Sequence, residues 1–340
     1  MPNKTKITKT DVAPIITSSD EEMLFTSLRA QSWQEFTGQE NIKKSLQIAI
    51  KAARQRHEAV DHVLFYGPPG LGKTTLSQLI AKEMGSNFKI TSGTALSKAG
   101  DLAAILTNLE DGDVLFVDEI HRLPKAVEET LYPAMEDFAL DIVIGKGPSA
   151  RTVRLDLAKF TLVGATTRFG LLTGPFRDRF GLIHRVEFYK PLELTSILQV
   201  ASLKLETILE DEAAAAIAER SRGTPRIALK LFKRVRDFTQ VLEKKAITLD
   251  LVKQALSIFE IDQLGLDEND RRLIMAMIEK HQGGPVGLKT LSASINEDPG
   301  TIEEVLEPYL IQIGFIKRTS TGRVLSEKAY QHFGRELPKK

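Results

Sequence analysis

The sequence predicts an α/β domain built on a parallel sheet, then a small all-helical domain, then a C-terminal winged-helix domain. Apolar runs at 62–66, 113–119 and 160–167 lack polar alternation, which is typical of strands buried on both faces of a parallel sheet. After Pro191 the apolar residues recur with helical spacing as far as residue 259. The last part of the chain has the pattern of three short helices followed by a hairpin, the order of a winged helix-turn-helix. We therefore expect a flexible tail and three domains, at 1–27, 28–190, 191–260 and 261–336.

Length and composition favour an ordinary soluble protein of more than one domain. The chain has 340 residues, of which 42% are hydrophobic and 27% are charged. It has no cysteine, so disulfides and thiolate chemistry are excluded and a reducing compartment is the simplest expectation. The first thirty residues contain no apolar leader, and no later run reaches the ~20 apolar residues that a membrane span needs. These features predict a cytoplasmic protein that does not enter a membrane.

Positive charge gathers in two places, although the net charge is only +1. Residues 217–245 hold nine Lys or Arg against three Asp or Glu, and residues 313–340 hold seven against two. Such surfaces suit nucleic acid. Solvated helix faces and a charged tail explain each of them equally well when each is taken alone.

A glycine-rich stretch, GPPGLGKT at 67–74, fits the P-loop pattern G-x-x-x-x-G-K-[ST]. The glycines allow backbone N–H groups to surround phosphates, while Lys73 reaches the outer phosphates. The Thr74 hydroxyl is placed to ligate Mg²⁺. A glycine turn without a ligand is the weaker alternative, because strand, loop and helix follow in the required order. We expect a site for ATP and Mg²⁺.

Two further strand ends supply candidates for the chemistry. Asp118 and Glu119 close the run LFVDE, where one carboxylate can hold the metal and its neighbour can polarise an attacking water. Without the P-loop before it, such an acidic pair would more simply be a helix cap. Thr167 is the last residue of the third apolar run and is our candidate for positioning the water, although strand-terminal threonines are common without such a role.

The segment TGPFRDRFG, at 173–181, places two arginines in a loop shortly after the third strand. Arginine suits phosphate because its planar guanidinium stays charged and offers two parallel contacts. Three interpretations stay open: the loop folds back over its own phosphates, its arginine completes the site of the next subunit in a ring, or Asp178 simply forms a surface ion pair. Another arginine, Arg226, lies at a helix N-terminus that Thr224 and Pro225 predict.

The segment 140–157 alternates apolar and polar residues on both sides of Gly-Lys-Gly-Pro-Ser, which predicts a β-hairpin. Ile142, Ile144, Val153 and Leu155 give one side of this hairpin more apolar surface than a solvent-facing ribbon needs. If exposed, this side would be a docking surface.

Eight segments, taken together, resemble the RuvB family, the AAA+ ATPases that drive branch migration of Holliday junctions. These segments are GPPGLGKTTL, DEIHRL, YPAMEDF, VGATTR, RDRFG, SRGTPRIA, GGPVGL and EDPGTIEEVLEPYLIQIGF. The resemblance runs from about residue 28 to residue 334 and implies an AAA+ fold with a lid and a winged helix. It also implies a hexameric ring that uses ATP and Mg²⁺ to draw duplex DNA through its centre in recombination and repair. The implied partners are RuvA, docked on the hairpin at 142–155, and the RuvC resolvase.

Carried over position by position, the resemblance assigns roles to individual residues. The catalytic residues would be Lys73, Asp118, Glu119, Thr167, Arg179 and Arg226. Arg179 would act in trans as an arginine finger, Arg226 would contact phosphate from the lid, and Thr74 and Asp118 would hold the metal. The nucleotide contacts would come from Leu28, Arg29, Phe36, Thr37, Gly70, Gly72, Lys73, Thr74, Thr75, Glu136, Asp137, Phe138, Tyr189 and Arg226.

Two segments depart from the family pattern. The family commonly has Leu-Arg-Pro near its start, whereas this chain has LRAQ at 28–31. The wing usually has Arg-Thr-Pro-Arg-Gly-Arg, whereas RTSTGR here has Ser320 and Thr321 in place of proline and an arginine. Arg318 and Arg323 remain for DNA phosphate. One lost phosphate contact flattens the slope of log K against log[salt] by ~0.9, so we expect weaker, less salt-sensitive DNA binding than with the full motif.

Two other functions are compatible with a P-loop on this fold. A clamp loader or protein remodeller would use the same ATPase to move a protein, which the winged unit argues against. A DNA-binding regulator would use the P-loop only as a nucleotide sensor and would tolerate the loss of Glu119.

Overall fold

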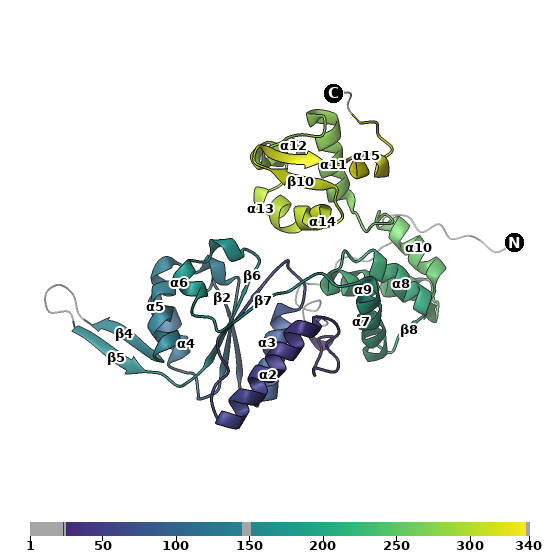
Figure 1. Cartoon of the computed structure of the whole chain (residues 1–340). Coiled ribbons are helices and arrows are strands. Elements are labelled where there is room, and N and C mark those ends of the chain that lie inside the picture. Colours follow the sequence, from purple (N-terminus) through teal and green to yellow (C-terminus); the bar gives the residue numbers. More distant parts are fainter. Residues whose placement is uncertain (1–22, 24, 145–150, 338–340) are drawn as a thin grey trace. The chain divides into compact units, whose positions relative to one another are not determined.

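The computed structural model of the chain describes residues 23, 25–144 and 151–337 (Figure 1). The chain divides into two compact units: the first is Ala30–Phe188, and the second takes in the described residues outside that range. Within the described ranges, no helix combines the length and the apolar character that crossing a membrane demands.

The first unit is built on a five-stranded parallel sheet with the strand order β2-β3-β6-β1-β7. The strands are β1 (Val63–Tyr66), β2 (Phe88–Ser92), β3 (Val114–Asp118), β6 (Thr161–Thr166) and β7 (Leu182–Arg185). The three inner strands are the predicted apolar runs, and β6 is buried along its whole length. The edge strands β2 and β7 were not expected. Each is only partly buried, so neither shows a continuous apolar run.

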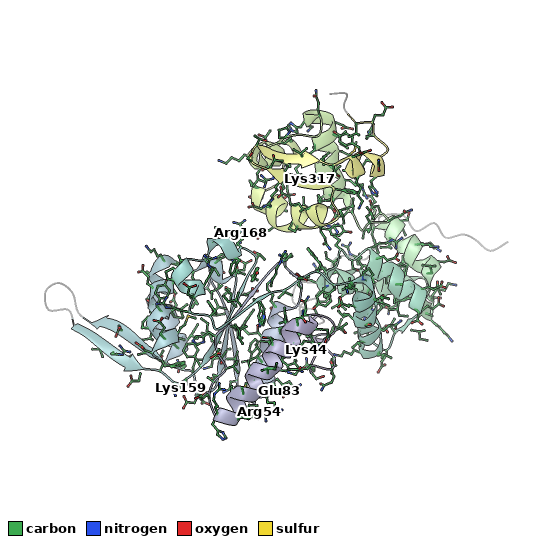
Figure 2. The ribbon with its side chains drawn as sticks, viewed as in Figure 1. Lys44, Arg54, Glu83, Lys159, Arg168 and Lys317 are labelled. Carbon is green, nitrogen blue, oxygen red and sulfur yellow. The ribbon has the colours of Figure 1, made fainter. Side chains whose placement is uncertain are left out.

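Helices flank this sheet (Figure 1). They are α2 (Glu40–Arg56), α3 (Lys73–Met84), α4 (Ala99–Leu106), α5 (Lys125–Glu136) and the short α6 (Gly174–Arg177), with one-turn 3₁₀ helices η1 (Ile120–Arg122) and η3 (Phe169–Leu171). Arg54 of α2 and Glu83 of α3 form an ion pair at 3.6 Å (Figure 2). His62, just before β1, is buried and accepts the N–H of Leu162 at 2.9 Å. Burial lowers the pKa of His62, so it is a neutral core residue.

The predicted hairpin forms and extends from the first unit as β4 (Ala139–Ile144) and β5 (Arg151–Asp156) (Figure 1). Ile142 pairs with Val153 and Leu140 with Leu155 across the hairpin. Val153 and Leu155 are 39% and 38% exposed. The turn at 145–150 and the side chains of Ile142 and Ile144 lie outside the described residues.

In the second unit the predicted helices follow Tyr189: they are α7 (Pro191–Lys204), α8 (Asp211–Glu219), α9 (Pro225–Val241) and α10 (Leu249–Ile258). Thr224 is the N-cap of α9 and Pro225 is its first residue, as predicted. One feature was not expected in an all-helical domain: β8 (Ile208–Leu209) pairs with β9 (Ala246–Ile247) in a two-residue parallel ladder. A strand of two residues is too short to show an alternating or apolar pattern in the sequence.

The winged-helix part follows the predicted order of helices and hairpin. It contains α11 (Glu268–His281), α12 (Leu288–Ile295), α13 (Pro299–Thr301), a π-helical turn η4 (Ile302–Leu306), α14 (Glu307–Gln312), β10 (Ile316–Thr319), β11 (Gly322–Leu325) and α15 (Glu327–His332). The third predicted helix is therefore interrupted by η4 just before Pro308, a residue that has no N–H to donate to the preceding turn. The wing is the antiparallel pair β10–β11, and the side chain of Lys317 is exposed on it (Figure 2).

Candidate nucleotide site and wing

The predicted P-loop connects β1 to α3 in a conformation that requires glycine. Gly67 has a φ of +141°, and a Cβ there would collide with the carbonyl oxygen of Val186. Gly72 is the N-cap of α3 with a φ of +93°. The loop therefore leads directly into a helix N-terminus, where backbone N–H groups attract phosphate.

Lys73 is buried at this helix start, with 8% of its surface exposed. Its Nζ donates to the carbonyl oxygens of Gly67 and Pro68, both at 2.8 Å. Burial lowers the pKa of Lys73 to about 8, although attraction to Asp118 and Glu119 opposes this shift. The lysine is thus held by the loop through neutral acceptors, and an anionic phosphate would stabilise its charge better than the carbonyls do.

The carboxyl ends of β1, β3 and β6 meet at one edge of the sheet. Tyr66 pairs with Thr166 and Val117 with Gly164, so the three parallel strands end at a similar level. Asp118 is the last residue of β3. Its carboxylate and the hydroxyl of Thr74, in the first turn of α3, are oxygen ligands of the kind that Mg²⁺ prefers. Within the described residues no group of three or more His, Cys, Asp or Glu is arranged to hold a metal ion.

Glu119 follows β3 in the left-handed region, with a φ of +47°. Its Oε2 pairs with Arg122 Nε at 2.7 Å, across the single turn of η1. The predicted catalytic carboxylate is therefore present at the sheet edge, but in this structure it contacts a guanidinium. To polarise a water molecule, as predicted, it would have to leave Arg122.

Thr167 lies directly after β6, and its hydroxyl oxygen is buried without a hydrogen-bond partner among the residues that the structure describes. Thr166, by contrast, is engaged: its Oγ1 is 3.0 Å from His121 Nδ1 and accepts the N–H of Arg168 at 2.9 Å. The sequence did not single out His121, because only the fold brings the η1 segment beside β6. An unsatisfied buried hydroxyl fits a residue that binds a water or phosphate.

Arg179 lies just after α6 and is held against α5. Its guanidinium is 4.1 Å from the ring centroid of Tyr132, it donates to Pro175 O at 2.6 Å, and it pairs with Glu136 at 3.1 Å. Arg177 lies over the ring of Phe169 instead. The two arginines of the loop therefore have different partners: Arg179 contacts α5 and α6, whereas Arg177 contacts η3.

The predicted nucleotide-proximal stretch 136–138 contacts other parts of the first unit. Glu136 contacts Arg179, and Asp137 pairs with Arg154 of the hairpin at 2.7 Å. Phe138 packs near the buried ring of Phe160. A nucleotide role for this stretch stays a prediction.

The remaining predicted nucleotide residues are divided between the two units. Phe36 is buried and Thr37 follows it in the first unit, close in sequence to α2. Leu28, Arg29, Tyr189 and Arg226 belong to the second unit. Burial lowers the pKa of Arg29, and Arg226 is exposed in the first turn of α9. Their contribution to the P-loop site stays a prediction.

The two arginines predicted to bind DNA share one buried carboxylate in the wing. Glu307 is fully buried and accepts from Arg318 Nε at 2.8 Å and from Arg323 Nε at 2.5 Å. Glu303 lies 3.6 Å from Arg318 and 3.9 Å from Arg323. The side chain of Arg318 is 47% exposed and that of Arg323 is 14% exposed. Arg318 is therefore the more accessible to a phosphate, while Arg323 is mostly an internal partner of Glu307.

The first unit has the strand order, the P-loop after β1 and the acidic pair after β3 that characterise the AAA+ class of P-loop ATPases. Models of the RuvB P-loop domain, the RuvB AAA lid domain and the RuvB C-terminal winged-helix domain match residues 28–186, 189–262 and 263–334. The chain therefore belongs to the RuvB family, which confirms the resemblance seen in the sequence.

Individual relatives agree with this assignment. The Holliday junction branch migration complex subunit RuvB of Chloroflexus aggregans is 55% identical over 322 residues, which are 95% of this chain and 92% of the relative. The solved structure of the RuvB Holliday junction branch migration motor of Thermotoga maritima is 52% identical, with a TM-score of 0.85. That comparison covers 92% of this chain and 100% of the other. The predicted α/β, lid and winged-helix architecture is thereby confirmed.

Proposed function

We propose that this chain is an ATP-driven DNA translocase that moves Holliday junctions, as a hexameric ring in the cytoplasm. The observation that carries the proposal is the buried, carbonyl-held Lys73 of a P-loop on the same chain as a winged-helix unit. Its relatives carry the names of a branch migration subunit and a branch migration motor. The exposed side chains of Val153 and Leu155 support docking of RuvA on the hairpin at 142–155, and RuvC is a further proposed partner.

The residues at the sheet edge supply the parts of ATP hydrolysis. Lys73 exchanges its two carbonyl acceptors for phosphate oxygens, and its charge offsets the charge that develops there. Glu119, once released from Arg122, polarises the attacking water, and the unsatisfied hydroxyl of Thr167 orients it. Thr74 and Asp118 would hold Mg²⁺, which supplies positive charge to the phosphates when bound.

Arg179 acts on the site of a neighbouring subunit in this proposal. Its contacts with Tyr132, Pro175 and Glu136 hold the guanidinium on the α5–α6 side of its own unit, which supports presentation to another chain. The guanidinium stays charged and matches phosphate oxygens in two contacts. Tyr189 and Arg226 would contribute contacts to the nucleotide from the second unit.

Mixing two inactive variants tests this arrangement. Arg179→Ala removes the finger and Glu119→Gln removes the base, so each variant alone should bind ATP and lose nearly all turnover, by ~10³ or more. In randomly mixed rings roughly one interface in four joins an intact Glu119 to an intact Arg179. Steady-state ATPase with duplex DNA should therefore reappear on mixing.

Arg177→Ala is the matched control, because Arg177 lies over Phe169 in the same loop. It should keep most turnover by itself. Mixtures of Arg179→Ala and Glu119→Gln that stay inactive while both variants form rings would exclude the trans assignment. ATPase that ignores duplex DNA in the parental protein would exclude the motor itself.

A further inference from the structure

The junction between the lid and the winged helix is built around Arg222, a residue that neither the P-loop site nor the wing uses. Arg222 lies between α8 and α9, is 8% exposed and has a φ of +54°, which is uncommon for a residue with a side chain. Its guanidinium reaches out of the lid into the winged-helix part. Nη2 pairs with Asp270 at 2.5 Å and with Asp267 at 3.1 Å, and Nε donates to Gly265 O at 2.7 Å.

The acceptors of Arg222 are themselves fixed in the winged-helix part. Asp267 is the N-cap of α11, and Asp270 completes a capping box with it from the first turn. Asp270 is fully buried, and burial raises its pKa to about 7 while Arg222 opposes that rise. The Arg222 guanidinium also lies 5.6 Å from the ring centroid of Tyr309, which is in α14, the helix before the wing. A single side chain thus contacts the start of α11 and the helix that precedes the wing.

Backbone groups also make contacts across this junction. Gly265 has a φ of +76°, and a Cβ there would collide with the carbonyl oxygen of Arg220 in the lid. Arg271 of α11 donates back to Glu260 O at 2.6 Å, across the connection between α10 and α11. Asp262 accepts from the N–H groups of Leu264 and Leu266 at 2.9 and 2.8 Å, which makes the connection a closed turn. The contacts of Arg222 therefore add side-chain interactions between the two domains to those that the connecting segment itself makes.

The position of Arg222 in the lid gives this junction its functional meaning. It comes two residues before Thr224, the N-cap of α9, and four before Arg226 in the first turn of that helix. We propose that Arg222 is a positioning residue that locks the winged-helix domain to the N-terminal end of α9, so that the two turn as one body. The part of this proposal that concerns transmission rests on the proposed function, because the movement transmitted would be the one that nucleotide imposes on Arg226.

A distance measurement tests the lock without any reference to ATP hydrolysis. The chain has no cysteine, so Val241→Cys on α9 and Lys317→Cys on β10 allow two spin labels to be placed on exposed positions of the lid and the wing. Pulsed electron double resonance on the doubly labelled full chain, with Arg222 intact, should give one narrow distribution of distances between the two labels. Adding Arg222→Ala should broaden it. Asp270→Asn, which keeps the shape of the side chain, should broaden it to a smaller extent and serves if Arg222→Ala does not fold.

Arg220→Ala is the matched control, because Arg220 forms its ion pair with Glu219 inside the lid at 3.4 Å. It should leave the distribution narrow. A distribution that stays narrow in both Arg222→Ala and Asp270→Asn, or that broadens equally in Arg220→Ala, overturns the lock.

The second readout is the stimulation of ATPase by duplex DNA, compared with the rate without DNA. If the lock transmits movement, Arg222→Ala should keep the rate without DNA and lose about fivefold or more of the stimulation, the lower range of coupling between distant sites. Equal loss of both rates would indicate a role in stability alone and would overturn transmission. A parental protein without DNA-stimulated ATPase would instead count against the proposed function, while the distance measurement would still decide the lock.

Discussion

Lys73 in the first unit and Arg222 in the second are buried to the same extent, each 8% exposed, but they are held by different acceptors. Lys73 Nζ donates to two neutral carbonyl oxygens, whereas Arg222 pairs with two carboxylates. A buried charge costs free energy unless an opposite charge compensates it. A buried cation on neutral acceptors is therefore prepared for an anionic ligand, while a buried cation on carboxylates stabilises the fold. Arg323, paired with Glu307 in the wing, is of the second kind.

The largest effect that follows from this comparison is on catalysis. Lys73→Met should lower ATPase turnover by ~10³ or more, because the charge that meets the phosphates is lost. The nucleotide-free protein should stay as stable as the parent, since burial already disfavours the charge that is removed. Steady-state ATPase and calorimetric melting of the ligand-free chain measure the two quantities.

Lys82→Met provides the control for this prediction. Lys82 lies on the same helix and donates to the Gln31 carbonyl at an exposed position, so its loss should leave turnover intact. A melting temperature that drops strongly in Lys73→Met would mean that Lys73 stabilises the ligand-free fold, as Arg222 does, and is not reserved for a ligand.

The next largest effect is on stability, and it concerns the two wing arginines that share the buried carboxylate of Glu307. Glu307→Ala leaves Arg318 and Arg323 without their shared carboxylate and should destabilise the winged-helix part by about 3 kcal/mol. The ATPase rate without DNA should not change. Calorimetric unfolding of the full chain measures the loss.

An exposed ion pair in the same part of the chain calibrates this result. Glu279 pairs with Arg335 at 3.2 Å, with both side chains more than half exposed, so Glu279→Ala should cost less than about 1 kcal/mol. If Glu307→Ala costs no more than Glu279→Ala, burial does not make the wing pair structural.

The smallest effect is a proton. The pKa of Lys73 is lowered to about 8, and a bound phosphate raises it again, so nucleotide binding takes up a proton wherever the free lysine is partly neutral. With a pKa of about 8 the uptake should be about 0.8 proton at pH 8.5 and ~0.1 at pH 7. Calorimetric titration with ADP in two buffers of different ionisation enthalpy measures this uptake.

Lys73→Arg separates the lysine from other titrating groups, because arginine stays charged at both pH values. Its complex should show no rise in proton uptake between pH 7 and pH 8.5. If proton uptake rises equally in parent and variant, another group takes up the proton, and the result no longer supports a lowered pKa for Lys73.

Local patterns in the sequence predicted the parts of the fold that depend on neighbouring residues. The inner strands β1, β3 and β6 could be recognised because strands buried on both faces are apolar throughout. The P-loop glycines and Thr224 at the start of α9 were likewise readable from neighbouring residues. The edge strands could not be found in this way, because half-exposed strands such as LIHR at 182–185 mix apolar and charged residues.

Contacts between distant residues could not be predicted from such patterns. The pairing of Arg222 with Asp270 joins two domains, and no spacing in the sequence relates the two residues. In the wing, Arg318 and Arg323 were interpreted only as phosphate contacts, because the sequence does not show that Glu307 folds beneath them. Their role in DNA binding stays a prediction, with Arg318 the better exposed of the two.

The contact between Gly67 and Val186 also constrains how this protein can change over generations. Only glycine fits at the first position of the P-loop, because the chain just after β7 passes directly against it. Two segments far apart in the sequence therefore shape one loop. A substitution at residue 67 is blocked while that backbone keeps its course, and a shift of the backbone after β7 would alter the loop without any change in its own residues. Among related sequences, Gly67 and the segment around Val186 should therefore change much less than the surrounding surface residues.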